Sequence, residues 1–170
     1  MVPTILFEVN DPDLRERFFR HLLFDALSGL RENIPPTWGK MTARQMVEHL
    51  VWAAEISTGR VQAECFFPEE QRERLKAFLH DNRPTPHEFQ NPALAAGLPP
   101  LRYSGLAAAT AALRAEMDRF LREAVATPST ARMHPVFGPI GSEAWARSHF
   151  KHCYHHLLQF GLISQGNTIS

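Results

Sequence analysis

The chain has 170 residues, of which 44% are hydrophobic and 21% are charged, a composition that fits a globular domain and excludes extensive disorder or a fibrous repeat. Lysine plus arginine and aspartate plus glutamate each number 18, so no basic surplus indicates a nucleic-acid partner. Two cysteines cannot form a disulfide framework, and charges interrupt every apolar run before membrane-span length. Because the N-terminus also lacks a secretory signal, we expect a cytoplasmic protein with no membrane partner and a single domain over residues 1–170.

Four amphipathic helices are predicted from the spacing of apolar residues, at residues 11–30, 42–59, 104–125 and 142–161. Pro12 suits the first turn of the first helix, and Thr42 with Gln45 forms a capping-box pattern at the start of the second. Ser142 is expected to cap the fourth helix. With no convincing strand in the sequence, these helices favour an all-α fold, a four-helix bundle.

The helical pattern loosens between the second and third helices, from residue 61 to 102. Residues 68–80 have one apolar edge and predict a short charged helix, whereas five prolines between residues 84 and 100 exclude a long one. We therefore expect a long Pro-rich excursion between helices 2 and 3 that folds over one end of the domain.

Histidine is concentrated in one region, because five of the nine histidines lie between residues 134 and 156, where an even spread would place about one. His149, His152 and His156 share one face of the fourth helix. The pair His152 and His156, one turn apart, can direct two imidazoles at one metal ion, and His49 on the second helix is a candidate third ligand. The alternative for His49 is a structural role, as a hydrogen-bonded core histidine.

Together these features resemble the DinB-like (YfiT-type) superfamily of metal-binding four-helix bundles, and most closely an uncharacterised branch of it. The motifs that carry the resemblance are Glu48-His49-Leu50, His152-x-x-x-His156-x-x-Gln159, Trp38-Gly39-Lys40-Met41-Thr42-Ala43 and His134-Pro135-x-Phe137-Gly138. The resemblance implies that His49, His152 and His156 bind a divalent metal ion, nickel or zinc.

The resemblance also implies a function. Several DinB-like relatives use this type of site for thiol chemistry, which suggests a metal-dependent S-transferase with a low-molecular-weight thiol as cosubstrate and a small-molecule electrophile as substrate. A metal-dependent hydrolase that activates water is one alternative. A non-catalytic metal- or ligand-binding protein is the other. Dimerisation is common among related bundles, so a homodimer is a further expectation.

Four more residues are candidates to support the ligands. His149 shares the ligand face and is expected to be an alternative ligand or the hydrogen-bond partner of one. His134 is expected near the cleft, with a structural His-Pro turn as the alternative. Gln45 precedes His49 by one turn and Gln159 follows His156 by three residues, so either can hydrogen-bond a site group or face solvent. Cys153 is next to His152 but points about 100° away, so we do not expect it to bind the same metal.

Overall fold

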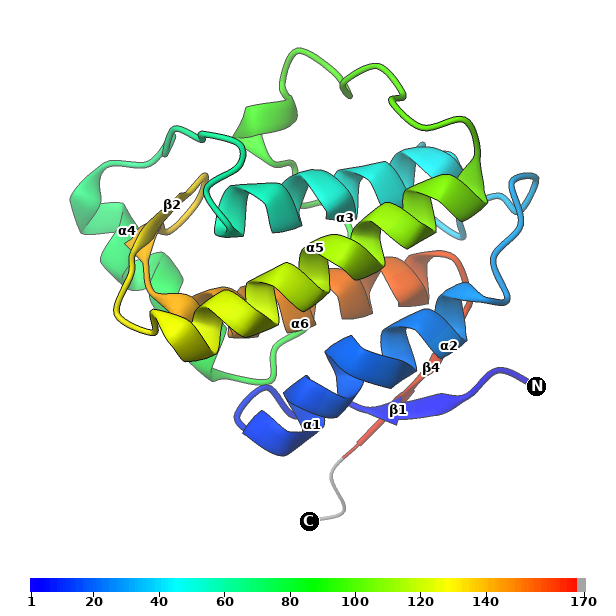
Figure 1. The fold of residues 1–170 in the computed structure, drawn as a ribbon, viewed down its shortest axis with the longest axis horizontal. Helices are drawn as coiled ribbons and strands as arrows, with labels where there is room; N and C mark the ends of the chain where they lie inside the picture. The colour runs from blue at the N-terminus through cyan, green and yellow to red at the C-terminus, as the bar shows by residue number, and fades with distance from the viewer. Residues whose placement is uncertain (168–170) are drawn as a thin grey trace.

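The structure, a computed structural model, describes residues 1–167 and is mostly helical (Figure 1). Its helical segments are α1 (Pro12–Arg17), the π-helical turn η1 (Phe18–Leu22), α2 (Leu23–Leu27), α3 (Ala43–Ser57), α4 (Glu69–Lys76), the 3-10 turns η2 (Ala77–His80) and η3 (Pro92–Leu94), α5 (Leu106–Ala126) and α6 (Ser142–Gln159). Its strands have three residues each and are β1 (Thr4–Leu6), β2 (Arg132–His134), β3 (Gly138–Ile140) and β4 (Ser164–Gly166).

The long helices pack side by side. Helix α3 runs along α5, and α6 packs against α3 and α2 (Figure 1). The segment α1–η1–α2 is one continuous helical rod, since the residues that join its parts, Arg17, Leu22 and Leu23, all have right-handed helical backbone angles. One apolar stripe of each helix is buried in a shared core, where Phe18 contacts Phe150 of α6 edge-to-face at 5.0 Å between ring centroids.

The expectation that the chain lacks strands was wrong. β1 pairs in parallel with β4, with Thr4 opposite Ser164, so the two ends of the described chain lie together. β2 and β3 form an antiparallel pair just before α6, with His134 opposite Gly138. Three-residue strands are too short to show an alternating pattern in the sequence, which is why neither pair was predicted.

The number of helices and some helix boundaries differ from those predicted. α4 and η2 together span residues 69–80, which confirms the short charged helix predicted at residues 68–80. The described helices are nevertheless more than the four of the predicted bundle, and α2 ends at Leu27 rather than Leu30. The capping box at the start of α3 is confirmed, because the Thr42 side chain accepts from the Gln45 backbone and the Gln45 side chain accepts from the Thr42 backbone. Ser142 does not cap α6, since Gly141 holds the N-cap position.

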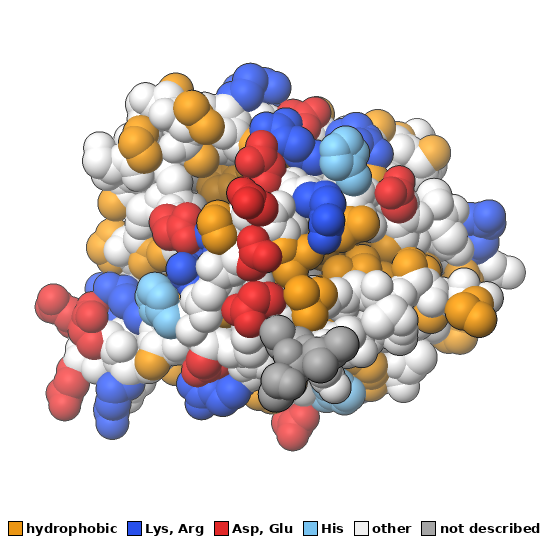
Figure 2. Space-filling view, turned by 90° about the horizontal axis from the view of Figure 1, so that it is seen from below, with side chains coloured by type: hydrophobic (Ala, Val, Ile, Leu, Met, Phe, Trp, Pro, Cys, Tyr) orange, Lys and Arg blue, Asp and Glu red, His pale blue; other side chains and the backbone are white. Residues whose placement is uncertain are grey.

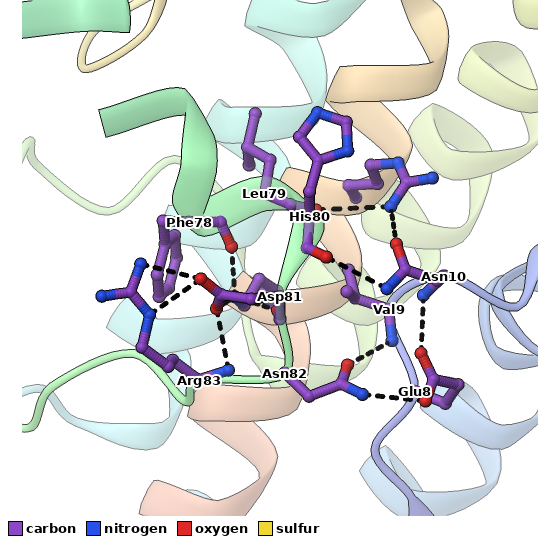
Figure 3. Close-up of polar contacts among 11 residues, drawn as sticks. Glu8, Val9, Asn10, Phe78, Leu79, His80, Asp81, Asn82 and Arg83 are labelled. Carbon is purple, nitrogen blue, oxygen red and sulfur yellow. Dashed lines mark hydrogen bonds and ion pairs between the residues drawn. The ribbon is translucent and has the colours of Figure 1, made fainter. Parts of the chain in front are cut away.

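The excursion between α3 and α5 is held to the rest of the molecule through residues 78–83. Figure 3 shows the contacts with the N-terminal segment, where Val9 donates to the Asn82 side chain at 2.9 Å and the Asn10 side chain donates to the His80 carbonyl at 3.0 Å. From the other side, the buried Nζ of Lys151 on α6 donates to the carbonyl of Phe78 and, at 2.7 Å, to that of Asp81. The turn is therefore fixed against α6 directly beside the histidine region.

The surface carries charges of both signs. On the face seen in Figure 2, acidic and basic side chains are interspersed, and neither sign covers the face alone. Among residues 1–167, no helix is both long enough and apolar enough to cross a lipid bilayer.

Candidate metal centre

Three histidines from two helices meet at one buried point. His49 comes from α3, and His152 and His156 come from consecutive turns of α6. The Nε2 atom of His152 lies 2.9 Å from Nε2 of His49 and 3.1 Å from Nε2 of His156. One ligand atom from each residue lies within 4.8 Å of the other two. The packing of α3 against α6 therefore turns the predicted i, i+4 pair into a three-donor cluster.

The environment of the cluster keeps its imidazoles neutral. Burial, followed by the charges of the neighbouring His156 and His155, lowers the pKa of His49 to about 3. Burial likewise holds the pKa values of His152 and His156 well below the ordinary histidine value. At neutral pH each ring thus carries one proton and one lone pair, which is the form that binds metals.

Gln159 determines which nitrogen of His156 carries the proton. The Gln159 amide nitrogen donates to the carbonyl of Trp38 at 2.9 Å, so its amide oxygen faces Nδ1 of His156 at 2.7 Å. An amide oxygen can only accept, so Nδ1 of His156 must be the protonated nitrogen. The lone pair of His156 is therefore on Nε2, directed at the other two histidines, as expected for a histidine that binds a metal through Nε2.

The cluster fits a divalent metal ion. Tetrahedral zinc–imidazole distances of about 2.0–2.1 Å correspond to about 3.3 Å between ligand nitrogens, close to the observed 2.9 Å and 3.1 Å. Three neutral nitrogen donors suit zinc and nickel alike and leave further coordination positions for a small molecule. These three residues would hold the ion.

The three histidines open onto a cavity of about 440 Å³. Its walls are mostly apolar and come from α3, from the excursion and from the β2–β3 hairpin; they include Trp52, Phe78, Phe89, Val136 and Phe137. Among the described residues that line it, three are cationic (Arg74, Arg83 and Lys151) and none is aspartate or glutamate. A cavity of this size accepts a small organic molecule, in contact with the three histidines.

The other four predicted site residues are not members of the three-histidine cluster. His149 lies outside the three-histidine cluster, since its Nε2 contacts the Ser57 hydroxyl at 2.8 Å, although the residue also lines the cavity. His134 also lines the cavity, where its Nε2 contacts the hydroxyl of Ser148 at 3.0 Å. The structure does not bring Gln45 to the cluster, because its side chain is used in the capping box of α3. Gln159 is the predicted supporting residue that contacts a cluster histidine directly.

Sequence reasoning missed Ser148 and the aromatic walls. Ser148 precedes His152 by four residues, so the spacing that identified the histidine pair also places this hydroxyl on the same face of α6. Phe78 belongs to the apolar edge of the short helix predicted at residues 68–80, but the sequence did not indicate what that edge faces. Phe89 reaches the cavity from the Pro-rich part of the excursion, which has no periodic pattern that could have indicated its direction.

The structure is thus a mostly helical protein in which one histidine of α3 and two of α6 form a candidate metal centre in the wall of a mostly apolar cavity. Residues 15–160 match the DinB superfamily, and the chain therefore belongs to that superfamily, as its motifs indicated. DinB proteins are metal-binding in general. No curated protein and no solved structure matches the chain.

Proposed function

We propose that this DinB protein binds a divalent metal ion, nickel or zinc, through His49, His152 and His156, and transfers a low-molecular-weight thiol to a small-molecule electrophile. The observation that carries the proposal is the convergence of three neutral imidazole nitrogens in the wall of a mostly apolar cavity. When bound there, a divalent ion supplies a site at which a thiol is held as its thiolate. In the transfer, the thiol loses its proton to solvent, its sulfur bonds to the electrophilic carbon, and the displaced group leaves with the bonding electrons.

The thiol in this proposal is external, because neither cysteine of the chain suits the role. Cys153 is fully buried, and burial raises the pKa of its thiol to about 12. Cys65 is half-buried and does not line the cavity. A reactive cysteine needs access and a lowered pKa, and Cys153 has neither.

The cavity lining favours thiol transfer over hydrolysis. Metallohydrolases such as the zinc proteases pair the metal with a carboxylate that acts as general base. None of the described lining residues is aspartate or glutamate. Thiol binding needs no such base, since a coordinating thiol is deprotonated by the metal.

Metal analysis of protein purified without a histidine tag tests the first part of the proposal. We expect about one nickel or zinc ion per chain, lost in His49→Ala, His152→Ala and His156→Ala. The matched control is His21→Ala, because His21 is exposed on η1 and should leave the metal content unchanged. Circular dichroism checks that each variant keeps its helices. No metal after reconstitution, or equal retention by all four variants, would refute the site.

The metal-loaded protein is then offered cysteine or glutathione with 1-chloro-2,4-dinitrobenzene as a generic electrophile. Metal-dependent conjugation that is absent in His152→Ala supports thiol transfer. Ester cleavage that needs metal but no thiol would instead establish the hydrolase. Metal binding with neither activity, across a broad panel of thiols, electrophiles and esters, would leave a binding protein.

A further inference from the structure

Two serine–histidine pairs involve adjacent residues of α6, Ser148 and His149, and they differ in one respect. In the first, Nε2 of His149 lies 2.8 Å from the hydroxyl of Ser57, which in turn donates to the carbonyl of Ala54 at 2.7 Å. In the second, Nε2 of His134 lies 3.0 Å from the hydroxyl of Ser148. Among residues 1–167, the Ser148 hydroxyl makes no other hydrogen bond, so its proton has no acceptor within the described protein.

The backbone fixes the direction of the hydrogen bond between His134 and Ser148. The amides of Val136 and Phe137 both donate to Nδ1 of His134, at 3.0 Å and 3.3 Å. Nδ1 therefore carries the lone pair, and burial keeps the ring neutral by lowering its pKa to about 3. The proton is on Nε2 and is donated to Ser148, which leaves the serine proton free to be donated onward.

This direction rules out His134 as a base for Ser148. A serine nucleophile needs a neighbouring nitrogen that accepts its proton, and the nitrogen of His134 that faces Ser148 already carries one. The pair is instead a relay of donors that runs from two backbone amides through the imidazole to the serine hydroxyl. Such a relay is arranged to bind an acceptor.

The cavity supplies the setting for that acceptor. Ser148 lines it one helical turn before His152, on the same face of α6. The lining cations Arg83 and Lys151 both pair with Asp81, whereas Arg74 has no ion-pair partner among the described residues. The unpaired positive charge of Arg74 and the absence of carboxylates among the described lining residues favour an anionic acceptor over a neutral one. The aromatic walls favour a ligand whose remaining part is apolar.

We propose that the cavity selects an aromatic carboxylic acid, whose carboxylate accepts a hydrogen bond from Ser148 while its reacting end lies at the three histidines. This inference rests on the proposed function, because it names the substrate class of the same site. Ser148 is then the residue that determines specificity, and His134 is a positioning residue that acts through it.

Isothermal titration of the zinc-loaded protein with thiophenol and with 4-mercaptobenzoate tests the inference. The sulfur of each probe is expected to bind the zinc ion. The rigid ring of 4-mercaptobenzoate prevents its carboxylate from reaching the same ion. A hydrogen bond to a charged group should make the carboxylate probe bind about tenfold more tightly than thiophenol. Ser148→Ala should abolish this preference and leave thiophenol binding unchanged. Ser57→Ala is the matched control, because it removes the other serine–histidine contact and should keep the preference.

The outcomes separate this inference from the proposed function. Equal binding of both probes to the unaltered protein, or a preference that survives Ser148→Ala, overturns the carboxylate site and leaves thiol binding intact. Loss of the preference in Ser57→Ala as well as in Ser148→Ala shows a general packing effect and also overturns it. If neither thiol binds the zinc-loaded protein, the proposed function is refuted, and the substrate class with it.

Discussion

Replacing Gln159 by methionine should weaken metal binding although Gln159 is not a ligand. Its amide oxygen accepts from Nδ1 of His156 and its amide nitrogen donates to the carbonyl of Trp38. Methionine preserves the length of the side chain and removes both hydrogen bonds. His156 can then rotate or take the other tautomer, with the proton on Nε2, and in that form it cannot bind a metal through this nitrogen.

The size of the effect follows from the burial of the contact. Removing the partner that orients a metal-binding histidine costs about 10- to 100-fold in metal affinity, or about 1.4–2.8 kcal/mol. Gln159 is only 5% exposed, so water cannot easily replace the lost acceptor. We therefore expect a loss in the upper half of that range.

Competition for zinc against a chromophoric chelator measures the dissociation constant of each variant. Gln62→Met is the matched control, since Gln62 is exposed and its amide only approaches the Gly59 carbonyl at 3.4 Å. An unchanged zinc affinity in folded Gln159→Met would refute the assignment of the His156 tautomer. An equal loss in the Gln62 variant would show that the effect is not specific to the site.

Three further outcomes are expected. Gly39→Ala should also lower zinc affinity, because Gly39 has φ +80° and an added Cβ would lie 2.7 Å from the amide nitrogen of Gln159. An unchanged zinc affinity in the competition assay would contradict this. Burial lowers the pKa values of His134 and His149 to about 3, so the unfolded chain binds more protons below about pH 6.5. In urea melts of metal-free protein, the free energy of unfolding should therefore be highest above that pH. Towards pH 4 it should fall by about 1.4 kcal/mol per pH unit for each of the two histidines, and a free energy that does not change with pH would contradict this. A thiol reagent should label Cys65 but not Cys153 in the native protein, and mass spectrometry of the labelled peptides checks this.

The parts of the structure that local patterns determine were predictable from the sequence. The capping box of Thr42 and Gln45 begins α3 where expected, because both hydrogen bonds form within one turn. The pair His152 and His156 shares a helix face for the same reason. Placing His49 opposite them required the packing of two distant helices, and the family motif supplied what periodicity could not.

The parts that depend on long-range contacts were not predictable. β1 and β4 pair across almost the whole length of the chain, and no local signal marks either strand. Gln45 and Gln159 each lie about one helical turn from a histidine, Gln45 before His49 and Gln159 after His156, yet Gln45 caps a helix and Gln159 orients His156. The role of Ser148 depends on a loop that turns Nε2 of His134 towards it, and that orientation exists only in the folded protein.

The three histidines are also part of the cavity wall, so an organic molecule bound in the cavity and a metal ion held by the histidines share one set of residues. Thermodynamic linkage then makes their effects reciprocal: if the metal tightens binding of the organic molecule tenfold, that molecule tightens binding of the metal by the same factor. The metal content of the protein at a given free-metal concentration therefore depends on how much of the organic molecule is present. With positive coupling of this kind, protein stripped of its small molecules during purification should lose metal more readily than protein saturated with them.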